Sequence, residues 1–116
     1  MGEAIRLPIQ KRFVYSLSDP ETGNVRYIGV TADTQRRYKD HCANFPEKSD
    51  KFNWIEELKS KGFLPVISVI EECDHFNASW RESYHIIEHL KKGCRPSDYI
   101  PKYAKTNSDF YTKEFI

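Results

Sequence analysis

Two short β-forming runs near the N-terminus place the strongest constraint on how this chain can fold. Residues 12–17 and 25–30 are mainly β-branched and aromatic, a composition that favours strands. The residues between them, 18–24, are rich in Ser, Asp, Pro, Gly and Asn, which favour turns. The chain is therefore expected to reverse direction there, so that the two runs pair as an antiparallel hairpin.

Two helical patterns follow the hairpin. Thr31 or Asp33 can cap a helix over residues 33–43, because their side-chain oxygens can accept from free backbone N–H groups of the first turn. A second helix is expected over residues 51–61, with Gly62 just past its end. Its apolar residues fall on one face and are Phe52, Trp54, Ile55 and Leu58.

A further strand and a further helix complete the pattern. The apolar run at residues 66–70 predicts a buried strand. Residues 77–92 predict a third helix that Gly93 ends, with Trp80 and Tyr84 among its apolar positions. An α+β fold follows, in which one three-stranded antiparallel sheet is flanked by helices. We expect one domain over residues 1–116, with a core from about residue 11 to residue 98 and an irregular C-terminal tail over residues 99–116.

Composition narrows the class of protein. Hydrophobic residues make up 39% of the 116 residues and aromatic residues 14%, enough to bury a core, so disorder is not expected. No apolar run is long enough to span a bilayer, and the first residues do not predict a signal peptide. The cysteines, at positions 42, 73 and 94, fit reduced thiols in a cytosol better than a disulfide framework. The net charge of +1 does not by itself indicate nucleic-acid binding.

Four groups of residues lie in a suggestive order. The first strand contains Phe13-Val14-Tyr15, and the second contains Tyr27-Ile28-Gly29. In the following helix, Arg37 and His41 are one turn apart and share a face. In the last helix, Glu82 lies midway between two apolar residues, Ala78 and Ile86, each four residues away. Together these groups resemble the GIY-YIG nuclease family over nearly the whole chain.

The resemblance implies a metal-dependent DNA endonuclease that hydrolyses phosphodiester bonds. Such a reaction needs an oriented water, a route for its proton, positive charge at the phosphoryl group and help for the leaving oxygen. The family pattern implies that Tyr15 binds or deprotonates the water with the help of His41. By the same resemblance, Tyr27 positions water or phosphate, Arg37 stabilises the developing charge, and Glu82 holds Mg²⁺ or Mn²⁺. A single carboxylate suits a cation that retains most of its waters.

The resemblance also implies substrate-binding positions and shows three departures from the family pattern, the first of which is Phe13 in place of a glycine. Gly29, Arg36 and Asp98 are the expected substrate-binding residues. Asp98 stands where an Asn is typical, and an aspartate lacks the amide donor. Val30 stands where many members have Lys, which removes one phosphate contact. These last two departures leave open a rival interpretation, a weak or inactive module of the same fold that binds nucleic acid or a protein partner.

Plainer interpretations exist for each residue taken alone. Tyrosines on strands commonly serve cross-strand packing, and an Arg and a His one helical turn apart commonly form a solvated face. His85 and His89 are also one turn apart, but no second ligand pair accompanies them, so we interpret them as surface histidines. A small α/β domain that binds RNA without hydrolysing it is a third hypothesis.

The sequence leaves the target of the activity open. Since a domain of this size has little surface for reading bases, we expect target choice to come from a homodimer, an additional specificity subunit or DNA shape. DNA is the expected partner, no membrane association is expected, and the expected location is the cytoplasm of a bacterial or phage-infected cell.

Overall fold

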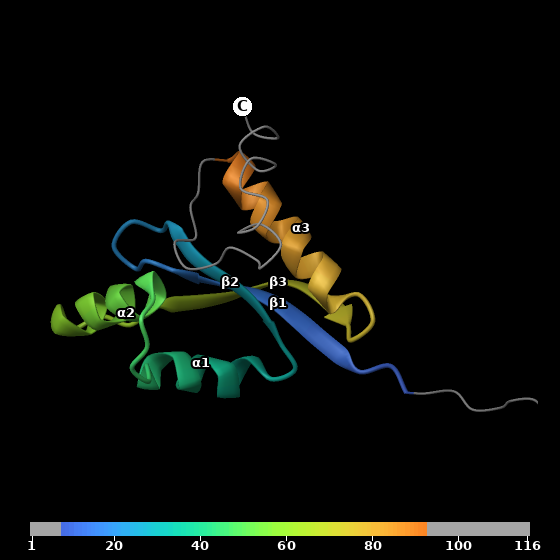
Figure 1. Cartoon of the computed structure of the whole chain (residues 1–116), viewed down its shortest axis with the longest axis horizontal. Helices are drawn as coiled ribbons and strands as arrows, with labels where there is room; N and C mark the ends of the chain where they lie inside the picture. Colours follow the sequence, from blue (N-terminus) through green and yellow to red (C-terminus); the bar gives the residue numbers. More distant parts are fainter. Residues whose placement is uncertain (1–7, 93–116) are drawn as a thin grey trace, which may run out of the picture.

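The computed structural model describes residues 8–92, and its elements follow the expected order (Figure 1). The strands and helices are β1 (Lys11–Ser18), β2 (Val25–Thr31), α1 (Thr34–Ala43), α2 (Asp50–Ser60), β3 (Val66–Asp74) and α3 (Ala78–Lys91). Each boundary lies within one residue of its prediction, apart from the end of β3, which continues past residue 70 to Asp74. The predicted tail, residues 99–116, lies outside the described residues.

The three strands form one antiparallel sheet in the order β2-β1-β3, which confirms the predicted α+β fold. The hairpin reverses where the turn formers predict it. One oxygen of Asp19 accepts hydrogen bonds from the backbone N–H groups of Glu21 and Thr22. Gly23 has a φ of +79°, a conformation that a residue with a Cβ adopts at a cost. These contacts fix the register of β1 against β2.

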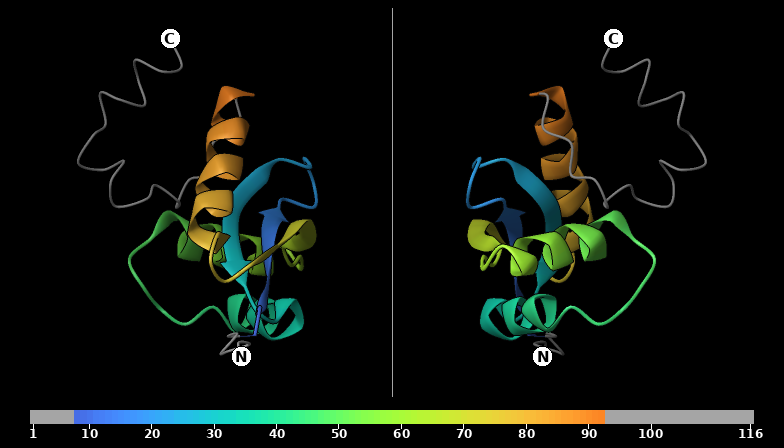
Figure 2. Two further views of the ribbon diagram at one scale, coloured as in Figure 1. Left: turned by 90° about the vertical axis from the view of Figure 1, so that its right-hand side faces the viewer. Right: turned by 90° about the vertical axis from the view of Figure 1, so that its left-hand side faces the viewer.

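The central strand, β1, has a hydrophobic cluster on each face because successive side chains of a strand point to opposite sides. Tyr15 and Leu17 pack against α2 in a cluster completed by Trp54, Ile55 and Leu58. On the other face, Val14 packs against Ile28 of β2 and Ile86 of α3. Figure 1 shows the resulting layers, with α3 above the sheet and α1 and α2 below it. Figure 2 shows β1 between its neighbours, with α3 rising beside β2.

One expectation about burial is wrong. The strand predicted as buried at residues 66–70 is an edge of the sheet, and Val69 is 53% exposed. The cause is that α3 packs chiefly over β2 and β1, which leaves much of β3 uncovered. On α3, Trp80 is 64% exposed and Tyr84 is also exposed, whereas Ile86 is fully buried. An apolar pattern predicts a helix, but only the packing decides which apolar side chains are covered.

Local contacts fix α1 and α2 relative to each other. The side chain of Asp33 caps α1 by accepting from the backbone N–H of Arg36. Asn44 ends that helix in the left-handed conformation, with a φ of +50°. The Asn44 amide then donates to the backbone oxygen of Phe52, at 3.1 Å, and to a carboxylate oxygen of Glu56, at 2.7 Å. A buried asparagine thus links the end of α1 to α2.

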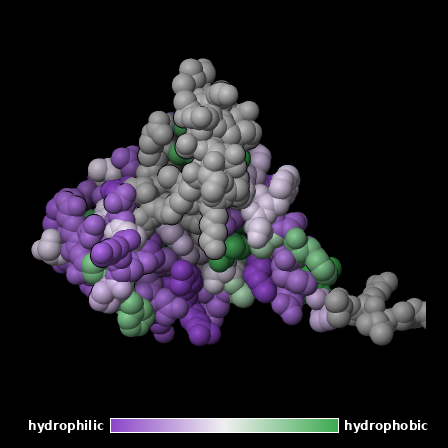
Figure 3. Space-filling view, viewed as in Figure 1, coloured by the Kyte–Doolittle hydropathy of each residue, from purple (hydrophilic) through white to green (hydrophobic). Residues whose placement is uncertain are grey.

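Within residues 8–92, no helix is both long and apolar enough to cross a membrane. The surface over α1 and α2 in Figure 3 is mostly hydrophilic. The hydrophobic side chains of α2 face the sheet rather than this surface. The polar side of these two helices surrounds the site described next.

Candidate active site

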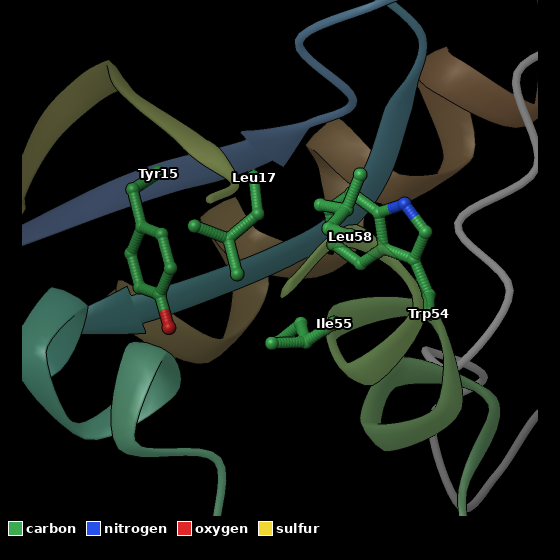
Figure 4. Packing of buried hydrophobic residues seen from close by; sticks show 5 residues of the cluster. All are labelled: Tyr15, Leu17, Trp54, Ile55 and Leu58. Atoms are coloured by element: carbon green, nitrogen blue, oxygen red, sulfur yellow. The ribbon is translucent and has the colours of Figure 1, made fainter. Parts of the chain in front are cut away.

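The register of the hairpin brings two tyrosines to one face of the sheet. Tyr15 pairs with Gly29 across β1 and β2, and Leu17 pairs with Tyr27. Tyr15 and Tyr27 are therefore diagonal neighbours whose side chains point the same way. Their ring centroids are 6.2 Å apart. In Figure 4 the Tyr15 hydroxyl points away from the sheet, toward α1.

Gly29 makes room for both rings. A Cβ at this position would lie 2.7 Å from the Tyr15 hydroxyl oxygen and 3.0 Å from Cε2 of Tyr27. Non-bonded carbon atoms prefer separations of about 3.5–4.0 Å, so any larger residue must displace at least one tyrosine. The space beside Gly29 is thus filled by the protein's own side chains.

Helix α1 supplies two nitrogen groups to the same hydroxyl. Nε2 of His41 lies 2.7 Å from the Tyr15 oxygen, and Nε of Arg37 donates to that oxygen at 3.4 Å. The His41 ring also meets Tyr27 edge-on, with 5.1 Å between centroids. The predicted common face of Arg37 and His41 is confirmed, and it faces the tyrosines rather than solvent. We call Tyr15, Tyr27, Arg37 and His41 the tyrosine cluster.

Burial and charge set the protonation of the cluster. Burial raises the pKa of Tyr15 above its ordinary value, and the neighbouring Tyr27 raises it further. Burial also raises the pKa of Tyr27, although Arg37 opposes this effect. For His41, burial and then the positive charges of Lys51 and Arg37 lower the pKa to about 3. At neutral pH both phenols are therefore protonated and the imidazole is uncharged, so a ring nitrogen of His41 can accept a hydrogen bond from the Tyr15 hydroxyl.

Access to solvent differs within the cluster. Tyr15 is completely buried and His41 is 2% exposed, whereas Tyr27 and Arg37 are partly exposed. The Tyr15 and Tyr27 rings also contact each other, and each tyrosine influences the pKa of the other. A polar chain therefore runs from the partly exposed Tyr27 through Tyr15 to His41. This chain gives a proton a route from the surface to a buried acceptor.

A hollow of about 380 Å³ opens beside the cluster, between the end of α1 and the start of α2. Arg37 and His41 line one part of it, and Lys51 lines another. The Lys51 ammonium lies 5.2 Å from the centroid of the Tyr27 ring, within the range of a cation–π contact. The hollow is thus bordered by two cations, by the carboxylates of Asp40 and Glu47 and by the uncharged His41.

This arrangement coincides with a family match. The family model described as the GIY-YIG catalytic domain matches residues 11–95, a span that contains every residue of the tyrosine cluster. The chain belongs to the GIY-YIG family. No curated protein and no solved structure matches it. Domains of the GIY-YIG family are endonucleases, and such nucleases generally use divalent metal ions.

Glu82 is the residue of this GIY-YIG domain that the sequence pattern predicts as the metal ligand. It lies partly buried on α3, and its charge acts on Tyr27. Within residues 8–92, no group of three or more His, Cys, Asp or Glu side chains is placed to hold a metal. A single carboxylate fits Mg²⁺, which binds through one or two protein oxygens and keeps its other waters.

The other predicted positions lie outside the cluster. Arg36 is exposed and lines a second, shallower hollow of about 200 Å³ together with Arg37. Asp98 lies beyond the residues that the structure describes. His85 is not a free surface histidine, since its Nε2 lies 2.7 Å from a carboxylate oxygen of Glu71. Arg81 binds the same carboxylate through two nitrogens, so these residues form a structural network.

Sequence reasoning missed two residues that shape the site. Asn44 carries a usable signal, because asparagine is one of the few residues that commonly end helices in the left-handed conformation. Lys51 carries none. It appears in the sequence as one charge in the first turn of a helix, and only the packing of α2 against the tyrosine cluster brings its ammonium to Tyr27.

Proposed function

We propose that this GIY-YIG protein is a metal-dependent DNA endonuclease that hydrolyses phosphodiester bonds. The observation that carries the proposal is the convergence of two tyrosines, an arginine and an uncharged histidine in one cluster, in which Arg37 and His41 both hydrogen bond to Tyr15. A site that only bound nucleic acid would not need a buried, uncharged proton acceptor behind its surface groups.

Exposure suggests how the work is divided. Because Tyr27 and Arg37 are the partly exposed members of the cluster, they contact the attacking water and the scissile phosphate. As the water attacks phosphorus, its proton passes to the Tyr27 oxygen while Tyr27 gives its own proton to Tyr15. Tyr15 passes its proton to Nε2 of His41, at the 2.7 Å contact, a transfer that requires the bound phosphate to offset the positive charges that lower the pKa of His41. The burial of Tyr15 thus moves the direct contact with water from Tyr15 to Tyr27.

Arg37 stabilises the negative charge that develops on the phosphoryl group during this step. Its guanidinium is held near both tyrosines, and although burial works to lower the pKa of Arg37, its interactions with Tyr15 and Tyr27 raise that pKa overall. The group is therefore permanently charged and pre-positioned. Donors placed in advance stabilise the extra negative charge of a five-coordinate phosphorus without costly reorganisation.

The metal, Mg²⁺ or Mn²⁺ in this proposal, would be held by Glu82 and would supply charge stabilisation for the leaving oxygen. Glu82 suits this role because it is the carboxylate whose charge reaches Tyr27 from α3. Gly29 contributes to substrate binding by letting both tyrosines occupy their positions. Arg36 is assigned to the DNA backbone because it is exposed beside Arg37. Asp98 keeps its assignment to the substrate from the sequence pattern alone.

DNA is the proposed substrate, and the proposal also covers how a target is chosen and where the protein acts. Target choice is assigned to DNA shape, to a second copy of the chain or to a further subunit, because a domain of this size has little surface for reading bases. The proposed location is the cytoplasm of a bacterial or phage-infected cell, where thiols such as the free Cys42 and Cys73 stay reduced.

Nicking of supercoiled plasmid tests the function. The intact protein should nick with Mg²⁺ or Mn²⁺ and lose this activity in excess EDTA. Glu82→Ala should lose activity, whereas Glu88→Ala, which removes another partly buried carboxylate of α3, should retain it. Metal-dependent nicking that survives Glu82→Ala would rule out Glu82 as the metal ligand. Failure of the intact protein to nick with any divalent ion would favour a non-catalytic binding module.

A further inference from the structure

Lys51 occupies an unusual place for a lysine. Its side chain is only 15% exposed, whereas that of Lys59, the other lysine of the same helix, is 38% exposed. The ammonium is held against the Tyr27 ring at 5.2 Å, and its charge also acts on His41. The folded chain therefore holds the Lys51 ammonium, which is normally mobile and strongly hydrated, against the tyrosine cluster. Holding it there costs side-chain entropy and hydration.

The partner of Lys51 offers little compensation. Glu47, in the loop before α2, has a carboxylate oxygen 3.5 Å from the Lys51 ammonium and a side chain that is 48% exposed. Ion pairs with a solvent-exposed partner contribute only about 0–1 kcal/mol to stability. The pair is therefore easily exchanged, and a different anion can take the place of the Glu47 carboxylate.

The hollow beside the cluster shows where such an anion would sit. Arg37, His41, Glu47 and Lys51 all line it, so its cations approach from two helices. Asp40 also lines it but is exposed, so its carboxylate can turn toward solvent. The available positive charges that border the hollow are consequently those of Arg37 and Lys51.

We propose that Lys51 is a substrate-binding residue that contacts a DNA phosphate in this hollow, and that Glu47 holds its ammonium in place until the phosphate displaces the carboxylate. The inference rests on the proposed nuclease function and assigns one of its phosphate contacts. A phosphate between Arg37 and Lys51 would offset the two positive charges that act on His41. The arrival of substrate would then make the imidazole a better proton acceptor.

Binding of a short fluorescent DNA duplex, measured in EDTA over a series of salt concentrations, tests this role. Lys51→Met should raise the Kd about tenfold, as expected for one charged hydrogen bond, and should reduce the slope of log K against log salt by about 0.9. Lys39→Met is the matched control, because Lys39 is exposed on α1 and does not line the hollow. It should change the Kd much less.

A second variant tests the proposed role of Glu47, and here the Kd for DNA is expected to fall rather than rise. Glu47→Gln frees the ammonium and should lower the Kd, whereas Glu57→Gln, which removes a comparable partner from Lys61, should have a smaller effect. If Lys51→Met weakens binding no more than Lys39→Met, or if Glu47→Gln does not tighten it, the assignment fails. If the intact protein neither binds nor nicks DNA, the proposed function itself fails. If the intact protein nicks DNA but either of these two variants gives the contradicting result, only the role of Lys51 is rejected.

Discussion

The rings of Tyr15 and Tyr27 occupy the space that a side chain at position 29 would need. The absent side chain lets the Tyr15 hydroxyl stand where a Cβ would otherwise come within 2.7 Å of it. That hydroxyl is the atom on which His41 and Arg37 converge. The glycine of Tyr27-Ile28-Gly29 is therefore a steric requirement of the tyrosine cluster, while the φ of Gly29 lies outside the left-handed region that favours glycine.

Gly29→Ala tests this requirement. The added methyl group should displace the Tyr15 hydroxyl and separate it from His41. A displacement of this kind should reduce the initial rate of plasmid nicking by about a hundredfold, while overpacking costs about 1–3 kcal/mol of unfolding free energy. Urea unfolding would show that the variant is folded, and Ser68→Ala, at an exposed position of β3, is the control. A folded Gly29→Ala protein that nicks at the original rate would contradict the steric account.

At the scale of elements, the sequence predicted what local chemistry decides. The hairpin, the three helices and the Asp33 cap follow from alternation, turn residues and capping side chains near one another in the chain. The burial of β3 did not follow. A short apolar run looks the same on a central strand and on an edge strand, and only the order β2-β1-β3 distinguishes them.

The candidate site divides in the same way. The shared face of Arg37 and His41 could be predicted, because one helical turn separates them. Whether Tyr15 and Tyr27 lie on the same face of the sheet depends on the register of the hairpin. The turn residues only suggest that register. The position of Lys51 depends on how α2 packs against the sheet, and no local pattern encodes it. Asp98 falls outside the described residues, so its role stays a prediction.

At the scale of the whole molecule, the uncharged His41 links the site to folding. The folded protein holds the pKa of His41 at about 3, whereas its ordinary value is 6.5. Between these values the unfolded chain binds a proton at this residue that the folded protein does not. The free energy of unfolding should therefore fall as pH falls from about 6.5 toward 3. His41 contacts Tyr15 and Tyr27, and the positive charges that act on it are those of Lys51 and Arg37.

Urea unfolding at pH 7 and pH 5, in the intact protein and in His41→Gln, measures this effect. The intact protein should lose about 2 kcal/mol more than the variant between the two pH values, since each pH unit within the window is worth up to about 1.4 kcal/mol. Asp19 and Glu71, whose pKa values are lowered from 3.8 and 4.5, contribute below this range and equally in both proteins. Equal losses in the two proteins would show that His41 is not held uncharged.

The most direct test of the tyrosine cluster as a nuclease site is the rate of plasmid nicking by Tyr27→Phe. This change removes one hydroxyl and keeps the ring that packs against His41 and Lys51. Tyr84→Phe makes the same change at an exposed tyrosine of α3 and is the matched control. We predict that Tyr27→Phe stays folded and nicks at least about a hundredfold more slowly, while Tyr84→Phe keeps the original rate. Equal nicking by the intact protein and Tyr27→Phe would contradict the account.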